Sequence, residues 1–132
     1  RTFADLGSAW AVGMRFGTGN AQYMTFLSSE NEKTVVLGLG NNNIPVGTVH
    51  LLRQGNFLFV TFTTNYPYVM NQVHLYVSNV APVNSNPGGF PYQYTVTDPA
   101  QYFNTYTFMV DVSAYAGQTL YIAAHAHVLI TQ

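Results

Sequence analysis

The chain has 132 residues, and its four Lys or Arg and five Asp or Glu residues make up only 7% of the sequence. Globular domains usually carry about 25% charged residues. With a formal net charge of −1 and so few cations, the chain has no electrostatic signal for binding nucleic acid or an anionic membrane surface. A hydrophobic content of 48% is too high for a disordered chain.

The length predicts a single domain over residues 1–132. The longest apolar run, Tyr121–Ile130, is much shorter than the roughly 18 residues that a membrane span needs. The absence of cysteine fits a reducing compartment, and it equally fits an exported protein stabilised by packing or assembly. The chain begins at Arg1, as it would after signal-peptide removal or tag cleavage. Together with a polarity carried by Thr, Asn, Gln and Tyr, this favours an extracellular or cell-surface location.

Alternation of apolar and polar residues runs through almost the whole chain, which is the pattern of half-buried strands. The expected strands are, in chain order, Ala9–Phe16, Ala21–Ser28, Lys33–Leu39, Val46–Arg53, Phe57–Thr64, Val69–Ser78, Tyr92–Val96, Thr105–Val112 and Thr119–Ile130. The clearest hairpin closes around Gln54-Gly55-Asn56. The proline- and glycine-rich stretch Asn79–Pro91 is expected to form a shaped loop, because proline does not serve a central strand.

No window has helical periodicity, although Asp111–Gly117 has room for one helical turn capped by Asp111. The strand spacing predicts an all-β protein, an antiparallel β-sandwich of the jelly-roll or immunoglobulin-like kind with eight or nine strands. Within Val69–Ser78, the alternation places Val69 on the face of Val73, and Met70 on the face of His74.

Two of the expected strands are apolar on both faces, namely Phe57–Phe62 and Thr119–Ile130. A strand in a simple two-layer sandwich has one face in water. The two-sided pattern therefore predicts that something covers the outside of these strands.

His125 and His127 are the best metal-ligating candidates, because residues i and i+2 of a strand point to the same side. A site would need a third ligand, from His74 or His50. The interpretation we favour is structural, with both imidazoles bonded to Tyr or backbone groups. We therefore expect neither a metal nor any other cofactor.

No sequence motif for a nucleophile elbow, a phosphate-binding loop, a dinucleotide site or a zinc protease is present. The carboxylates also have structural interpretations. Glu30 and Glu32 share a solvated loop, and Asp98 begins a turn before Pro99. The sequence therefore predicts that the protein is not an enzyme.

Tyrosine and phenylalanine gather near the expected loops, beside Asn and Gln. Such rings suit stacking on sugars, and they suit a packed protein interface equally well. The candidate glycan contacts are Tyr66, Tyr68, Phe90 and Tyr92.

Four short motifs occur in order between Val46 and Val128: His-Leu-Tyr-Val at His74–Val77, Pro-Gly-Gly-Phe-Pro-Tyr at Pro87–Tyr92, Tyr-Thr-Phe at Tyr106–Phe108, and Tyr-Ile-Ala-Ala-His-Ala at Tyr121–Ala126. In this combination the chain resembles a family of secreted bacterial cell-surface β-sandwich proteins. The resemblance implies an exported, non-enzymatic β domain and supplies no catalytic residues. It also implies that His74 and His125 adjoin.

The leading hypothesis is a structural subunit of an extracellular homopolymer, a filament or surface layer, in which copies meet through β-strand and apolar contacts. Residues 1–11 are the expected donor segment, because they precede the regular hairpins. The expected interface residues are Phe3, Leu6, Phe57, Phe59, Tyr121 and Leu129. The alternative is a secreted carbohydrate-binding or adhesive module with a cell-surface glycan as its partner.

Overall fold

A computed structural model describes all residues from Arg1 to Gln132. It contains ten strands and three single turns of 3-10 helix, and every strand pairing is antiparallel. The strands are β1 (Phe3–Ala11), β2 (Met14–Arg15), β3 (Gln22–Phe26), β4 (Glu32–Leu39), β5 (Ile44–Gln54), β6 (Phe57–Thr64), β7 (Tyr68–Ser78), β8 (Tyr92–Thr95), β9 (Thr105–Asp111) and β10 (Leu120–Thr131). The 3-10 turns are η1 (Pro87–Gly89), η2 (Pro99–Gln101) and η3 (Ser113–Tyr115). The all-β antiparallel prediction is confirmed.

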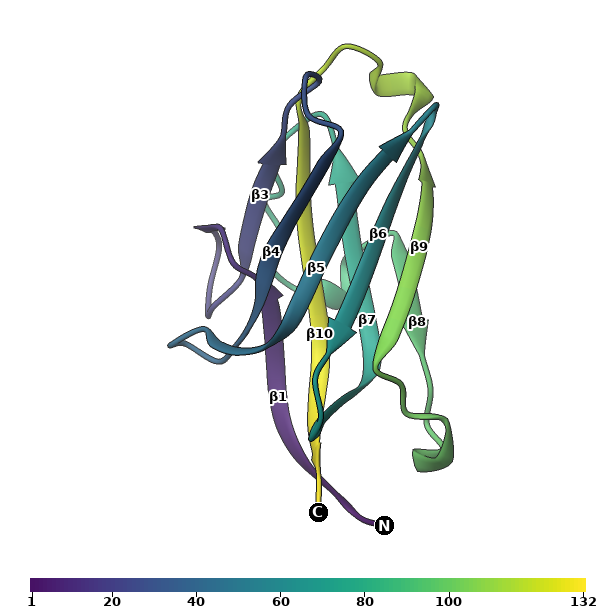
Figure 1. Cartoon of the computed structure of the whole chain (residues 1–132). Coiled ribbons are helices and arrows are strands. Elements are labelled where there is room, and N and C mark those ends of the chain that lie inside the picture. The colour runs from purple at the N-terminus through teal and green to yellow at the C-terminus, as the bar shows by residue number, and fades with distance from the viewer.

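The strands form two facing layers (Figure 1). The front layer has the order β4-β5-β6-β9, and the back layer is built on β10, which is flanked by β7 on one side and by β1 and β3 on the other. Strand β1 joins the layers, because Phe3–Trp10 pairs with β10 while Ala9–Ala11 pairs with β4. The arrangement is that of a β-sandwich whose layers are continuous along one side.

The local patterns correctly identify most of the strands. The expected hairpin is β5–β6, and it turns at Gly55 with a φ of 60°, a conformation that suits glycine. Ten strands form instead of the expected eight or nine, because Phe3–Ala11 is itself a strand and Gly13 separates it from the two-residue β2. The helical turn expected after Asp111 is η3, and the Asp111 carboxylate accepts a hydrogen bond from the Ser113 amide.

The main core lies between the two layers and is built by the inward-facing residues of every long strand. Strand β6 shows the alternation plainly, since Leu58, Val60 and Phe62 are fully buried and the residues between them are not. The largest fully buried side chains are Phe26, Phe62, Leu37, Leu51, Leu58, Met70, Leu75, Leu120 and Ile122.

A bulge in β7 overturns one expected face. Gln72 pairs with His127 and Met70 pairs with Val128, so Asn71 is an extra residue without its own partner on β10. Met70 is therefore turned into the core, where it is fully buried, and Val69 is displaced from the face of Val73. The alternation in the sequence continues through this bulge and so gives no sign of it.

Residues 1–11, expected to be a donor segment, are not extended away from the domain but pair within their own sheet. Strand β1 lies inside the sheet between β10 and β4, and Ala9, Trp10 and Ala11 are buried. The backbone of Gln132 also donates a hydrogen bond to Thr2, which holds the two ends of the chain together. Residues 3–11 therefore complete the back layer of their own molecule.

The side of the sandwich opposite β1 is closed by side chains and not by strand pairing. Tyr94 of β8 stacks on Tyr106 of β9 with ring centroids 4.3 Å apart, and Tyr92 meets Phe108 edge to face. Strands β8 and β9 each pair with only one neighbour and thus remain edge strands.

The structure contains no helix with the length and apolar character needed to cross a bilayer.

Candidate functional site

Three of the four motifs that carry the family resemblance meet on the outer face of the back layer. His74 on β7 lies opposite His125 on β10, and Trp10 on β1 lies on the other side of His125. On the far side of His74, Gln93 of β8 continues the same row across the sheet. The implied proximity of His74 and His125 is thus present in the structure.

The two imidazoles form a buried hydrogen-bonded pair, here called the histidine pair. Their Nδ1 atoms are 3.0 Å apart, so one ring donates its proton to the other. The Nε2 atom of His125 is 2.9 Å from the Ser8 hydroxyl, and the Trp10 ring meets the His125 ring edge to face at 4.9 Å. Both polar atoms of His125 are therefore satisfied inside the protein.

The environment of the histidine pair favours neutral imidazoles. Burial, with smaller contributions from the nearby His74 and His127, lowers the pKa of His125 to about 3. Burial also lowers the pKa of His74, with a smaller contribution from His127. The pair is therefore uncharged at neutral pH, which suits a structural hydrogen bond.

The chain itself covers this second face of β10. The loop after β7 folds back over the sheet and places Phe90 against Trp10 and Tyr76, with ring centroids 5.9 and 6.0 Å apart. The Gln93 amide donates to the carbonyl oxygens of Gly88 and Phe90 and so ties the loop to β8. The two-sided apolar pattern of Thr119–Ile130 is thus explained within one molecule.

The histidines predicted for a metal do not come together as a set. His127 points to the same side of β10 as His125, but its Nε2 atom lies 2.7 Å from the Asp5 carboxylate. His50 is on the front layer, where it contacts Glu32. The structure contains no group of three His, Cys, Asp or Glu side chains placed to hold a metal ion.

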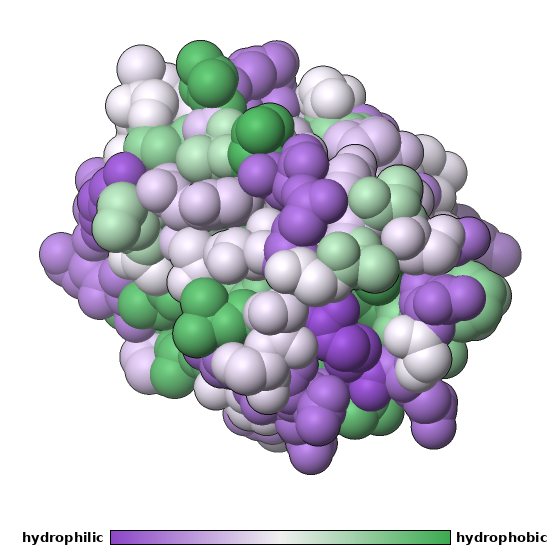
Figure 2. Space-filling view, turned by 90° about the horizontal axis from the view of Figure 1, so that it is seen from above, coloured by the Kyte–Doolittle hydropathy of each residue, from purple (hydrophilic) through white to green (hydrophobic).

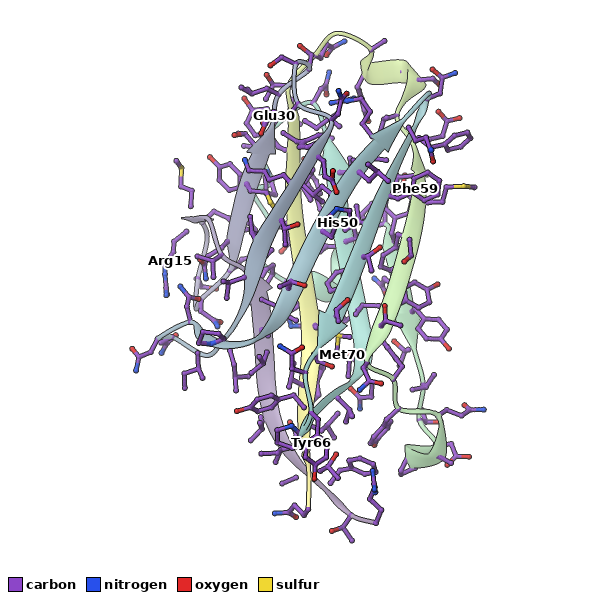
Figure 3. All side chains as sticks on the ribbon, viewed as in Figure 1. Arg15, Glu30, His50, Phe59, Tyr66 and Met70 are labelled. Atoms are coloured by element: carbon purple, nitrogen blue, oxygen red, sulfur yellow. The ribbon has the colours of Figure 1, made fainter.

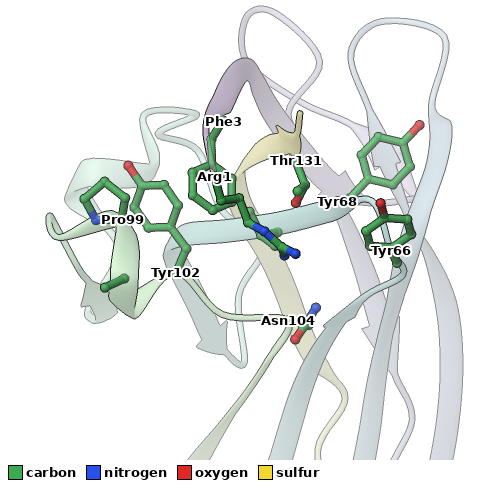
Figure 4. Close-up of a pocket in the computed structure, with 10 residues that line it drawn as sticks. Arg1, Phe3, Tyr66, Tyr68, Pro99, Tyr102, Asn104 and Thr131 are labelled. Atoms are coloured by element: carbon green, nitrogen blue, oxygen red, sulfur yellow. The ribbon is translucent and has the colours of Figure 1, made fainter.

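A separate pocket lies where both chain ends meet the β6–β7 and β8–β9 connections, and we call it the tyrosine pocket (Figure 4). Its volume is about 510 Å³, which is within the range of small-molecule sites. Tyr102 and Pro99 lie on one side and Tyr66 and Tyr68 on the other, with the Arg1 side chain between them. The lining residues are Arg1, Phe3, Tyr66, Tyr68, Val69, Pro99, Ala100, Tyr102, Asn104 and Thr131.

The strands and one turn hold this pocket in shape. Phe3 and Thr131 are paired across β1 and β10, and the Phe3 ring packs edge to face on Tyr102 at 4.9 Å. Turn η2 begins at Asp98, whose carboxylate accepts a hydrogen bond from the Ala100 amide. The structural interpretation of Asp98 is confirmed, and its turn positions the Tyr102 side of the pocket.

The four predicted glycan contacts do not form one site. Tyr66 is 82% exposed and lines the tyrosine pocket together with Tyr68. Phe90 is only 4% exposed, because the loop tied down by Gln93 turns its ring onto Trp10, so its prediction is wrong. Tyr92 is half-buried against Phe108 and is not in the pocket.

The predicted interface residues are also spread over the molecule. Phe57 and Phe59 point outward on β6 of the front layer, whereas Leu6 is exposed on β1 of the back layer. Leu129 is only 6% exposed, since it lies on β10 between β1 and β7, so its prediction as a contact residue is wrong. The two others are half-buried against neighbouring rings, Phe3 on Tyr102 and Tyr121 on Tyr23.

Several residues of both sites were not predicted. Ser8 gives no sign of its bond to His125, because it is separated from that residue by most of the chain. Tyr102 and Asn104 follow a turn at Asp98, much as Tyr66 and Tyr68 flank Pro67. Tyrosines beside prolines at two turns were a usable signal, but only the fold shows that the two turns meet.

Comparison with protein-family models finds no match to this chain, and comparison with curated proteins finds no significant similarity.

Proposed function

We propose that this protein is a non-enzymatic structural subunit that associates with copies of itself into an extracellular homopolymer, a filament or surface layer. The observation that carries the proposal is the exposed edge of β9, a seven-residue strand whose only charged residue is its last, Asp111. Copies meet through this edge and through the apolar side chains beside it.

Soluble proteins usually protect an edge strand with lysine, proline or a bulge, because its unpaired backbone groups bind other strands. Strand β9 has none of these features. It pairs with β6 without a shift of register from Thr105 to Asp111, and its outer edge has no strand partner. The Asp111 carboxylate is occupied by the Ser113 amide. The edge is thus straight, almost uncharged and open to strand addition.

A row of apolar side chains crosses the outer face next to this edge. Leu52, Phe59 and Met109 are direct neighbours across β5, β6 and β9, and Met109 is 61% exposed. Figure 3 shows Phe59 on this part of the front layer. Threonines of β6 and β9 flank the row, and Thr61 bonds to Thr107. This face offers apolar contact without charge repulsion.

The upper end of the sandwich in Figure 1 has a mixed surface. The end with the Leu27–Glu30 and Gln54–Asn56 turns shows apolar patches separated by polar ones (Figure 2). Lys33 and Glu30 form an ion pair in this region. Because residues 3–11 pair within their own sheet, lateral contacts through β9 take the place of the donor segment 1–11 in the proposed assembly.

Open polymers need two different contact surfaces, because a surface that pairs with itself closes into a dimer. Strand β8 lies on the same side of the sandwich as β9, so contact through these two edges alone closes into a pair. The second surface in the proposed polymer is the edge of β2, which pairs only with β3 and ends the strand order opposite β9. A β9 edge that meets this edge of the next copy generates a continuing chain of subunits.

The test is the state of association of the purified protein, measured by sedimentation and electron microscopy over a range of concentrations. We expect ordered polymers, and we expect Met109→Lys to abolish them by placing a charge at the contact. Val83→Lys changes an 88% exposed loop residue away from β9 and serves as the control. A wild-type protein that stays monomeric at millimolar concentration contradicts the proposal, as does a Met109→Lys variant that polymerises normally.

A further inference from the structure

We propose that the tyrosine pocket binds a sugar ring that carries a carboxylate group, such as a uronic acid. This site is separate from the β9 edge, and its occupation does not depend on self-association. It narrows the carbohydrate-binding alternative to one place and one ligand class.

The ring component of the ligand follows from the aromatic walls. Three tyrosines and Phe3 contribute to a pocket of about 510 Å³, enough for a monosaccharide and part of a second ring. Tyr66 is 82% exposed, which leaves a ring face free in the isolated molecule. Aromatic faces offer apolar contact to the C–H groups of a sugar while the phenol hydroxyls meet its polar rim.

The hydroxyl groups of the ligand have partners here. Tyr23 and Tyr76 use their phenol groups in bonds within the chain, but those of Tyr66, Tyr68 and Tyr102 have no such bond. The Asn104 amide and the Thr131 hydroxyl add both donors and acceptors from the pocket wall. A polyhydroxylated ligand matches this mixed lining better than a purely apolar one.

The carboxylate component follows from Arg1. Its guanidinium group belongs to the only charged side chain that lines the pocket, and it forms no ion pair within the chain. Figure 4 shows it between the two tyrosine walls. Arginine binds carboxylates through two parallel hydrogen bonds, so an acidic sugar gains affinity over its neutral counterpart.

The experiment is an NMR titration of the full chain with sodium glucuronate, with glucose as the matched neutral sugar and acetate as the carboxylate without a ring. We expect glucuronate to shift the resonances of Tyr66, Tyr102 and Thr131, and to bind roughly tenfold more tightly than glucose or acetate. Absence of binding by glucuronate, or equal affinity for glucuronate and glucose, would overturn the proposal.

Variants separate the two components of the site. Arg1→Gln is expected to remove the preference for glucuronate over glucose, while Arg15→Gln, at an exposed arginine bonded to Asn41, leaves it unchanged. Tyr66→Ala is expected to weaken glucuronate binding about tenfold, and Tyr66→Phe to retain most of it. Tyr66 is mostly exposed, so these variants should fold. Binding that is unaffected by both Arg1→Gln and Tyr66→Ala also rules the site out.

Discussion

At the scale of single residues, the histidine pair is the most distinctive element. Two imidazoles in direct contact inside a protein are stable only while both are neutral, because a buried positive charge is costly. Ser8 and the ring of Trp10 complete their surroundings. The pair therefore links the stability of the back layer to pH.

We expect the free energy of unfolding to fall as the pH drops below 6.5. The unfolded chain takes up a proton at His125 near pH 6.5, whereas the folded chain takes it up only near pH 3, so stability is lost progressively between these values. The loss from His125 is about 2 kcal/mol at pH 5 relative to pH 7.5, and the lowered pKa of His74 acts in the same direction. Urea unfolding at a series of pH values measures it.

His125→Gln should flatten this pH dependence, because glutamine keeps hydrogen-bonding groups and does not titrate. Tyr76→Phe is the matched control. It removes the bond from Tyr76 to the Val80 carbonyl close to the pair, lowering stability equally at all pH values. An unchanged slope in His125→Gln would show that other groups cause the pH dependence.

Phe90 is the residue that covers the Trp10 side of the back layer, and Phe90→Ala is expected to cost about 3 kcal/mol. Trp10 is the only tryptophan and is 3% exposed, so its fluorescence should shift to longer wavelength in the variant. Val83→Ala, at an exposed position of the same loop, should change neither property. An unshifted emission with full stability would mean that Phe90 does not cover Trp10.

At the scale of elements, Gly47 of β5 is the glycine with the least room for a side chain. Its neighbour Val46 is the extra residue of a bulge, since Leu37 pairs with Gly47 and Gly38 pairs with Pro45. A Cβ atom added at Gly47 would lie 1.8 Å from the Thr63 carbonyl oxygen of β6. The β5–β6 pairing therefore depends on the absence of a side chain at this position.

Gly47→Ala is thus expected to destabilise the protein by about 3 kcal/mol or more, because backbone has to move. Gly88→Ala is the comparison. The nearest atom to its added Cβ is the Asn86 side-chain oxygen at 3.3 Å, so we expect a change of about 0.5 kcal/mol or less. Thermal unfolding of the two variants measures the difference, and equal melting temperatures would contradict it.

At the scale of the whole molecule, local patterns in the sequence account for the strands better than for their neighbours. The β5–β6 hairpin and the inward face of β9 follow from alternation and one turn. The position of β10 between β1 and β7 depends on pairings between distant segments, which no local pattern contains. The family resemblance implied the contact of His74 with His125, and alternation alone did not.

The sites were only partly predictable for the same reason. The sequence predicts that something covers the second face of β10, but only the fold shows that Phe90 of the same chain does so. The tyrosine pocket was half identified through Tyr66 and Tyr68, and its other half comes from the turn at Asp98. The low charge of the chain is visible in the sequence. Only the strand order shows that β9, which has a single charged residue, is an edge strand.

The central place of β10 also has a consequence for the order of folding. This strand is the last of the ten in the chain, and it pairs with β1, β3 and β7. A chain that is synthesised or threaded from its N-terminus therefore holds most of the back layer without its middle strand until residues 120–131 emerge. Such long-range pairing makes folding slow and cooperative. We therefore expect the back layer to form in one late step, once β10 can pair with β1, β3 and β7.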